Sequence, residues 1–211
     1  MPVARSSSYL IVEGDGDVAF FQHALSHVGK TSVSVERTLG TGGLQRVLAA
    51  VAVALQPSAD ANGPSKVAVI FDADKKHADH WAEYVGHFAA AGLPKPIRPG
   101  DWVNGKKDDR AVQTMLYLLP GPDRVGAIET LLLKTLTDST GYACVDELVK
   151  CWTEAGVVGA DAADKVRMQA WLSQYADKKY VHLKSAHDDG RQPWNLDHPE
   201  LSPLLDLLRQ L

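Results

Sequence analysis

The sequence has few cysteines and no long apolar run, and these absences limit the classes of protein that it can belong to. Its two cysteines, Cys144 and Cys151, lie seven residues apart in one predicted helix, so we expect them to face the core rather than form a disulfide. They lack the CxxC spacing of a zinc site. No apolar stretch approaches the roughly 20 residues that cross a bilayer, and the N-terminal MPVARSSS is too short and polar for a secretion signal. We therefore expect a cytoplasmic protein with no membrane partner.

Internal repeats and low-complexity tracts are also missing. The 211 residues, 45% of them hydrophobic and 23% charged, suit one globular domain with a sizeable core. The formal net charge of −4 argues mildly against a nucleic-acid partner. If bound cations neutralised five carboxylates, however, the remaining net charge would be about +1, so net charge hardly discriminates between partners.

Short apolar runs alternate with helical patterns through the first part of the chain. Strands are predicted at 9–12, 31–37, 67–71 and 112–119, and helices at about 15–28, 44–55 and 77–91. This alternation predicts an α/β fold with a mainly parallel, Rossmann-like sheet flanked by helices. Further helices are predicted at about 124–137, 144–155, 161–174 and 199–210. We expect a single domain over 1–211, with a core at about 9–137 and a helical C-terminal part at about 138–211.

Two of these predicted strands end in clusters of acidic residues. Glu13 in VEGDGD (12–17) directly follows the first strand, Asp17 lies in the first turn of the next helix, and Asp72 and Asp74 in FDAD (71–74) leave the third strand. The carboxyl ends of parallel strands share one edge of the sheet, where ligands bind. Carboxylates that meet there resist ionisation unless a cation neutralises them, and oxygen ligands without thiolates favour Mg²⁺ or Mn²⁺. Taken separately, each cluster is also compatible with a solvated loop or a helix cap.

The order of these acidic residues resembles the Toprim domain of topoisomerases, bacterial primases and OLD-type (overcoming lysogenisation defect) nucleases. The resemblance covers about residues 9–186 and is closest to small stand-alone bacterial Toprim-like proteins without an ATPase domain. Asp17, four residues after the first Glu, favours the OLD type. The same resemblance assigns the later acidic residue to Glu129 and a lysine to Lys184. Ala127 departs from it, because OLD-type sites usually carry a small hydroxyl residue there.

The function that this resemblance implies is metal-dependent hydrolysis of phosphodiesters in DNA or RNA, in DNA repair or phage defence. Two ions, Mg²⁺ or Mn²⁺, would activate water and stabilise the leaving oxygen. The resemblance implies catalytic roles for Glu13, Asp72, Asp74 and Lys184, with Glu13, Asp72 and Asp74 on the first ion and Asp17 and Glu129 on the second. It leaves open whether a partner ATPase or a homodimer is needed.

Two further segments are candidates for contact with nucleic acid. The turn LGTGG offers Gly42 and Gly43, whose backbone N–H groups could cradle a phosphate, and Arg46 lies one turn further on. No GKS or GKT follows, so we expect no NTP hydrolysis. The second segment is WVNGKKDDR, within a predicted loop from Pro94 to Arg110, and its cations are Lys106, Lys107 and Arg110. An ordinary strand-to-helix turn and an ordinary solvated loop are the alternatives for these two segments.

Two other functions compete with a nuclease. A Toprim-like module could keep the acidic cluster and bind nucleic acid, or act as a regulator, without turnover. FDADKK also looks like the first motif of haloacid dehalogenase phosphatases, but that motif usually lies near the start of the chain and continues to Thr or Val, whereas Lys75 and Lys76 follow here.

Overall fold

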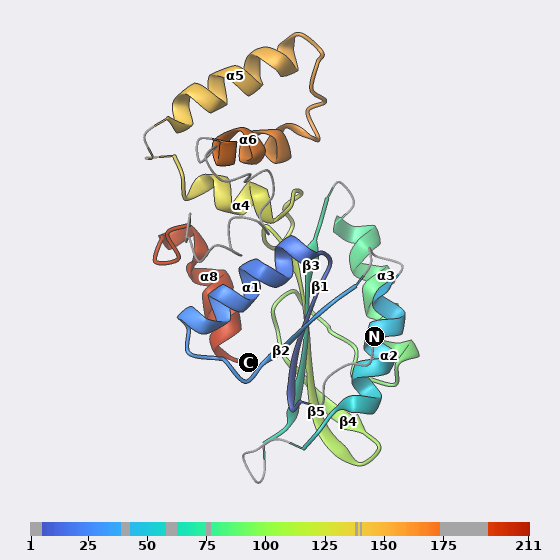
Figure 1. Cartoon of the computed structure of the whole chain (residues 1–211). Helices are drawn as coiled ribbons and strands as arrows, with labels where there is room; N and C mark the ends of the chain where they lie inside the picture. Colours follow the sequence, from blue (N-terminus) through green and yellow to red (C-terminus); the bar gives the residue numbers. More distant parts are fainter. Residues whose placement is uncertain are drawn as a thin grey trace.

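In the residues that the structure describes, five strands form one sheet that is parallel except at one edge (Figure 1). The computed structural model describes residues 6–38, 43–57, 63–74, 77–137, 139, 141–173 and 194–211. In spatial order the strands are β2 (Ser34–Arg37), β1 (Ser8–Val12), β3 (Ser65–Asp72), β5 (Arg110–Leu119) and β4 (Val103–Lys107). The pairs β1–β2, β1–β3 and β3–β5 are parallel, and β4–β5 is antiparallel. The expected Rossmann-like α/β fold is confirmed.

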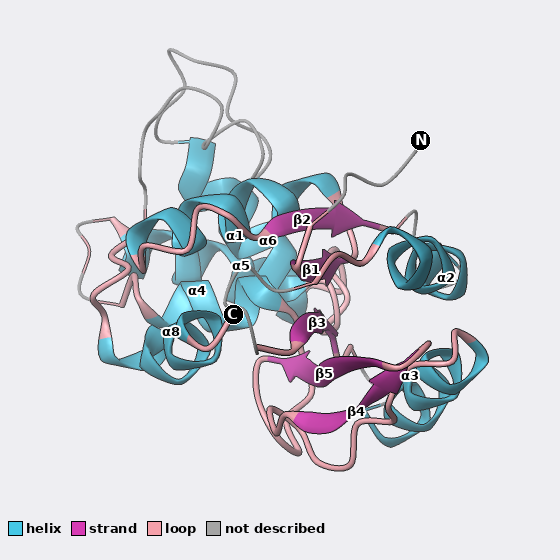
Figure 2. Ribbon diagram, turned by 90° about the horizontal axis from the view of Figure 1, so that it is seen from below, coloured by secondary structure: helices cyan, strands magenta, loops and turns pink. Residues whose placement is uncertain are grey.

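Helices cover both faces of the sheet, as Figure 2 shows in a view along it. On one face lie α2 (Leu44–Ala54) and α3 (His77–Ala90), and on the other lie α1 (Asp15–His27), α4 (Ile128–Lys134) and α8 (Ser202–Arg209). A short 3₁₀ helix, η3 (Pro199–Leu201), precedes α8, and α5 (Tyr142–Glu154) and α6 (Ala163–Leu172) pack together beyond α4. None of the described helices is both long and apolar enough to cross a membrane.

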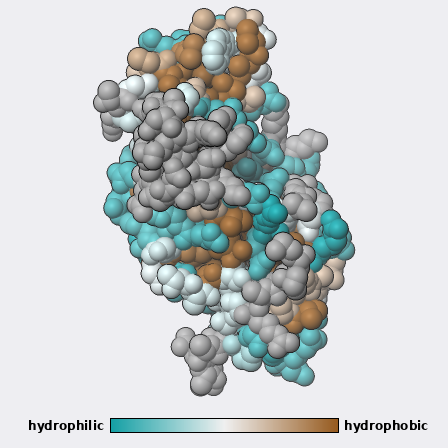
Figure 3. All heavy atoms as spheres, in the orientation of Figure 1, coloured by the Kyte–Doolittle hydropathy of each residue, from teal (hydrophilic) through white to brown (hydrophobic). Residues whose placement is uncertain are grey.

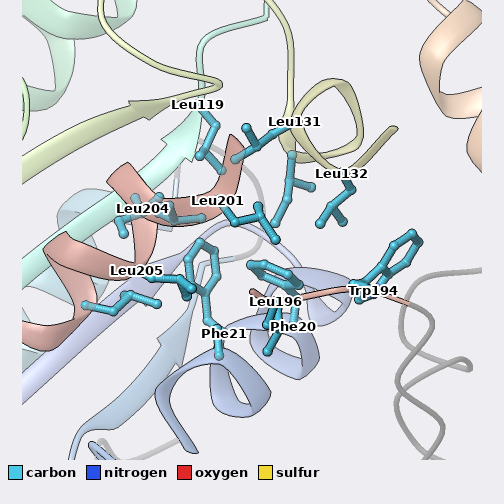
Figure 4. Packing of buried hydrophobic residues seen from close by; sticks show 14 of the residues in the cluster. Phe20, Phe21, Leu119, Leu131, Leu132, Trp194, Leu196, Leu201, Leu204 and Leu205 are labelled. Carbon is cyan, nitrogen blue, oxygen red and sulfur yellow. The ribbon is translucent and has the colours of Figure 1, made fainter. Parts of the chain in front are cut away.

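The core between the sheet and α1, α4 and α8 contains side chains from both the first and the last elements of the chain. Phe20 and Phe21 of α1 pack edge to face, with ring centroids 5.2 Å apart. They meet Leu119 of β5, Leu131 of α4 and Leu204 of α8 in one buried cluster (Figure 4). Burying such side chains is the main favourable contribution to folding. The C-terminal helix is therefore part of the sheet's own core.

The expectation of a loop from Pro94 to Arg110 is wrong in its second half, where β4 and β5 form a hairpin at the sheet edge. Its turn residues Asp108 and Asp109 both have positive φ, +48° and +63°, as tight hairpin turns require. A Cβ added at Gly105 would lie 2.5 Å from Pro94 Cγ, so this strand position needs glycine. The strand was missed because its polar, glycine-containing sequence has low β-propensity, which edge strands tolerate.

The expectation that the cysteines face the core is also wrong. Cys144 and Cys151 are free thiols on the exposed side of α5. Leu148 on the same helix is 43% exposed, and Figure 3 shows hydrophobic surface at the end of the molecule where α5 lies. The predicted helix is present, but among the described elements α5 packs mainly on α6, and part of its apolar surface stays exposed.

Candidate functional site

The acidic residues lie where the strand order of the sheet reverses direction. The chain goes from β1 outward to β2 and then returns to the other side of β1 to form β3. In a parallel α/β sheet, ligands bind beyond the carboxyl ends of the strands at such a switch point. Glu13 directly follows β1, Asp72 is the last residue of β3, and Asp74 lies two residues further on. The first two acidic clusters are therefore brought to the same edge.

Backbone pairing brings a third segment to this edge. The N–H of Asp74 donates to the carbonyl of Gly126 at 2.8 Å, and the N–H of Gly126 donates back to the carbonyl of Asp74 at 2.9 Å. Asp74 adopts a φ of +47°, which is uncommon for a residue other than glycine and often marks functional sites. This pairing fixes the start of α4, and with it Glu129, beside the end of β3.

Asp72 and Glu129 are placed by the start of α4. The Asp72 Oδ1 atom accepts a hydrogen bond of 2.9 Å from the backbone N–H of Ile128, the first residue of the helix. Glu129 follows in the first turn, and its Oε2 atom is buried with no hydrogen-bond partner among the described residues. An unpartnered buried carboxylate oxygen is costly unless a proton, water or cation satisfies it. Among the five carboxylates, Glu129 is therefore the one with a buried oxygen that a bound cation could satisfy.

The alternation of side chains turns the two strand ends toward different faces of the sheet. Ile70 belongs to the core shared with α1, α4 and α8, so Asp72, two residues on, continues that face. Ile11 belongs to the core shared with α2 and α3, so Glu13 continues the opposite face. The site therefore straddles the end of the sheet.

Asp72 and Glu13, on the two faces of the sheet, interact most strongly with different neighbouring carboxylates. The nearby negative charges that raise the pKa of Asp72 most are those of Asp17 and Glu129, whereas for Glu13 the strongest is that of Asp74. The five carboxylates thus form an inner group, Asp17, Asp72 and Glu129, and an outer group, Glu13 and Asp74. The groups are coupled, because Asp17 also acts on Glu13, and Glu13 also acts on Asp72.

Burial and mutual repulsion both disfavour ionisation in this cluster. Burial is the largest cause in each case: it raises the pKa of Glu13, the pKa of Asp17 to about 6, and the pKa of Asp72 well above its ordinary value. The neighbouring carboxylates raise all three pKa values further. At neutral pH, positive charge at this edge would be strongly stabilising.

Asp17 also has a structural role, as the helix-cap alternative anticipated. Its Oδ2 atom accepts a hydrogen bond of 2.8 Å from the backbone N–H of Gly14, which precedes α1. This bond lowers the pKa of Asp17, but by less than burial raises it. Capping orients the side chain beside Glu129 and therefore does not exclude a second role in the cluster.

Lys165 of α6 faces the cluster and was missed by the sequence analysis. Burial acts to lower the pKa of Lys165, but the negative charges of Glu129, Asp72, Asp74 and Glu13 together raise it. No motif marks this lysine, because its position depends on how α6 docks against α4. Lys184, the lysine that the family resemblance indicated, lies outside the described residues.

A hydrogen-bond network holds α6 against α4. The hydroxyl of Thr130 donates to Asp164 Oδ2 at 2.7 Å and accepts from the backbone N–H of Ala127 at 3.2 Å. Arg167 then joins Asp164 Oδ1 at 3.0 Å to Asp146 Oδ1 at 2.8 Å. Asp164 is the neighbour of Lys165, so this network fixes the lysine relative to Glu129. The hydroxyl absent at Ala127 is present one turn later, at Thr130, where it caps the helix.

The remaining predicted contacts with nucleic acid fall in different places. Gly43 precedes α2 and packs on Thr38, whose hydroxyl donates to the carbonyl of Glu13 at 3.4 Å, so it lies near the acidic edge. Arg46 is exposed in the first turn of α2, and Gly42 lies outside the described residues.

The hairpin cations lie at the opposite end of the sheet. Arg110 begins β5, whereas Leu119 at the other end of this strand pairs in register with Asp72. The ten residues of β5 place roughly 30 Å between the two ends. The Arg110 guanidinium also donates to the Leu55 carbonyl, and Lys107 pairs with Asp108 at 3.3 Å. Lys106, Lys107 and Arg110 are therefore not brought together with the carboxylates.

A cavity of about 300 Å³ lies beyond the end of β5 and is separate from the acidic site. The residues that line it include Tyr117, Arg124, Glu200 and Pro203, and none of the five carboxylates lines it.

The carboxylates do not surround a common point in the structure. Within the described ranges, no group of three or more His, Cys, Asp or Glu side chains is arranged so that it could hold a metal ion as it stands.

The raised pKa of Asp17 predicts how stability depends on pH. In the folded protein this carboxyl holds its proton up to about pH 6, but in the unfolded chain only up to about 3.8. The wild type should therefore lose stability as pH rises from about 4 to about 6, and Asp17→Asn should lose less, because only the raised pKa values of the other carboxylates, such as Glu13 and Asp72, still act in the variant. In urea unfolding with EDTA, we expect the variant's advantage to grow by roughly 2–3 kcal/mol between pH 4 and pH 7.

The matched control for this pH experiment is Asp15→Asn. Asp15 lies on the same helix turn, but it is exposed and pairs with Arg37. Its variant should show no such growing advantage, and a difference between Asp17→Asn and wild type that stays flat with pH would contradict the proposed environment of Asp17.

Fold and site together define an α/β protein with a Rossmann-like sheet, five carboxylates and a lysine at the edge where such sheets bind ligands. The chain belongs to the family DUF3226, "Protein of unknown function (DUF3226)", which matches residues 7–211. No curated protein and no solved structure matches the chain.

Proposed function

We propose that this protein is a metal-dependent nuclease, a phosphodiester hydrolase acting on DNA or RNA with a Toprim-like site, and that it works in the cytoplasm. The observation that carries the proposal is the gathering of carboxylates from the ends of β1 and β3 and from α1 and α4 around the switch point of the sheet, with the charge of Lys165 acting on them. Acidic side chains gathered in this way are suited to binding cations that in turn bind phosphate.

The donor set fits Mg²⁺ or Mn²⁺ in its chemistry. All five side chains offer hard carboxylate oxygens, and Glu129 Oε2 is buried without a partner in the described part of the chain. Since no three of them surround one point as they stand, ion binding would draw the side chains together and relieve their mutual repulsion.

The grouping of the charges changes the assignment of the carboxylates to two ions. Asp17, Asp72 and Glu129 would hold one ion, and Glu13 and Asp74 would hold the other, so Asp72 joins the inner group. When bound, a pair of such ions supplies an activated water and stabilises the leaving oxygen of a phosphodiester. Lys165, which is exposed and interacts electrostatically with the carboxylates, would bind the scissile phosphate and offset the negative charge that develops on it.

A nicking assay tests this proposal against a non-catalytic module. Supercoiled plasmid, single-stranded DNA and RNA are incubated with the protein and either Mg²⁺, Mn²⁺ or EDTA. We expect cleavage only with a divalent cation, and its loss in Asp74→Ala. Binding of nucleic acid without cleavage by the wild type would instead support the binding module, and equal cleavage by Asp74→Ala would point to a contaminating nuclease.

A further inference from the structure

Tyr84 of α3 carries a buried hydroxyl that the proposed mechanism does not use. Its side chain is fully buried, yet its hydroxyl oxygen has no hydrogen-bond partner among the described residues. Buried tyrosine hydroxyls usually find a partner, because leaving one unpaired costs free energy. The hydroxyl of Tyr84 is therefore available to donate a hydrogen bond to an acceptor beside it.

The ring of Tyr84 is held firmly by its neighbours. It packs edge to face on Phe71 of β3, with centroids 5.2 Å apart, and lies 5.6 Å from the ring of His80. His80 has a buried Nδ1 atom that also lacks a partner in the described part of the chain. Because Phe71 directly precedes Asp72, this packing fixes the hydroxyl relative to the end of β3.

Several carboxylates lie near Tyr84. Burial raises the pKa of Tyr84, and the neighbouring charges of Glu13, Glu83, Asp74 and Asp72 raise it further, in that order. The hydroxyl therefore keeps its proton at neutral pH and can only be useful to these carboxylates as a donor. Glu83 is exposed on α3 itself and lies 3.6 Å from His87 Nε2, so it is not a buried acceptor for the hydroxyl. Glu13 is the acceptor that the α3 side of the site offers, since it continues the face of the sheet that α3 covers.

We propose that Tyr84 is a positioning residue, whose hydroxyl donates a hydrogen bond to Glu13 when that carboxylate binds a cation. Hydrogen bonds of this kind fix the orientation of a metal ligand, and losing one typically weakens metal binding by 10–100-fold. The inference rests on the proposed function, because it needs Glu13 to be a cation ligand.

The test is Tyr84→Phe, which keeps the ring packing and removes only the hydroxyl. We expect the thermal stability of the cation-free variant to equal or exceed that of the wild type, since a buried unpaired hydroxyl is lost. The Mn²⁺ dissociation constant, measured by calorimetry, should rise about tenfold. Tyr117→Phe is the matched control, because Tyr117 is nearly buried on the other face of the sheet, and it should leave Mn²⁺ affinity unchanged.

A double-mutant cycle assigns the effect to Glu13. In the background of Glu13→Gln, Tyr84→Phe should cause no further loss of Mn²⁺ affinity. If the wild type binds Mn²⁺ and cleaves nucleic acid but Tyr84→Phe binds Mn²⁺ equally well, the role of Tyr84 is wrong and the nuclease stands. If the wild type binds no Mn²⁺, the proposed function and this inference fail together.

Discussion

Asp72→Asn is expected to withstand heat better than the wild type when divalent cations are absent, and yet to cleave nucleic acid at least about 10³-fold more slowly. The asparagine keeps an oxygen that can accept the hydrogen bond from Ile128 and removes a charge that burial and the carboxylates of Asp17 and Glu129 disfavour. In a chain of this size, each 1 kcal/mol gained raises the melting temperature by roughly 2–4 °C. The lost activity corresponds to about 4 kcal/mol of transition-state stabilisation.

The two opposite effects distinguish a functional carboxylate from a structural one. Melting curves in EDTA and single-turnover cleavage rates in Mn²⁺ measure them on the same preparations. Asp206→Asn is the matched control: Asp206 is exposed on α8, pairs with Arg209, and should change neither quantity appreciably. A variant Asp72→Asn that melts below the wild type and cleaves normally would show that Asp72 is only a cap for α4.

Lys165→Met is expected to slow cleavage by about 10²- to 10³-fold while making Mn²⁺ bind more tightly. The lysine is a positive charge that acts on all five carboxylates that define the site, so its removal leaves their negative charge less compensated and favours cation binding. The same change removes the group that we assign to the phosphate, where losing one electrostatic contact typically costs this much in rate. Mn²⁺ titration and cleavage kinetics would record the two effects separately.

Lys150→Met provides the comparison for this prediction, because Lys150 is also exposed on the α5–α6 hairpin but does not appear among the charges that act on the carboxylates. It should leave both the rate and the Mn²⁺ affinity close to those of the wild type. Equal losses of rate in the two lysine variants would indicate a general effect of net charge on substrate binding, and would remove Lys165 from the site.

The part of the site that the sequence could predict is the part set by strand ends. Glu13 and Asp72 are found at the ends of two apolar runs, and neighbouring parallel strands necessarily carry their carboxyl ends to one edge. Glu129 lies far along the chain, and only the family resemblance pointed to it. Its position is set by the backbone β-bridge between Asp74 and Gly126, and no sequence pattern predicts that bridge.

The features that the sequence did not predict depend on tertiary packing. Lys165 reaches the site because Thr130 and Asp164 hold α6 to α4, and neither residue type is unusual in a helix. The sequence predicts a loop where β4 lies, because a polar edge strand shows little of the apolar pattern on which strand prediction depends. Tyr84 was missed because a single tyrosine on an amphipathic helix is typical of core packing.

A direct count of bound Mn²⁺ tests the central claim that these carboxylates form a divalent-cation site. Calorimetric titration of the wild type and of Asp72→Asn at pH 7.5 gives both the number of ions and their affinity. We expect two ions for each wild-type chain, and weaker binding with the loss of at least one ion in the variant. A wild type that binds no Mn²⁺, or a variant that binds the same number equally tightly, would contradict it.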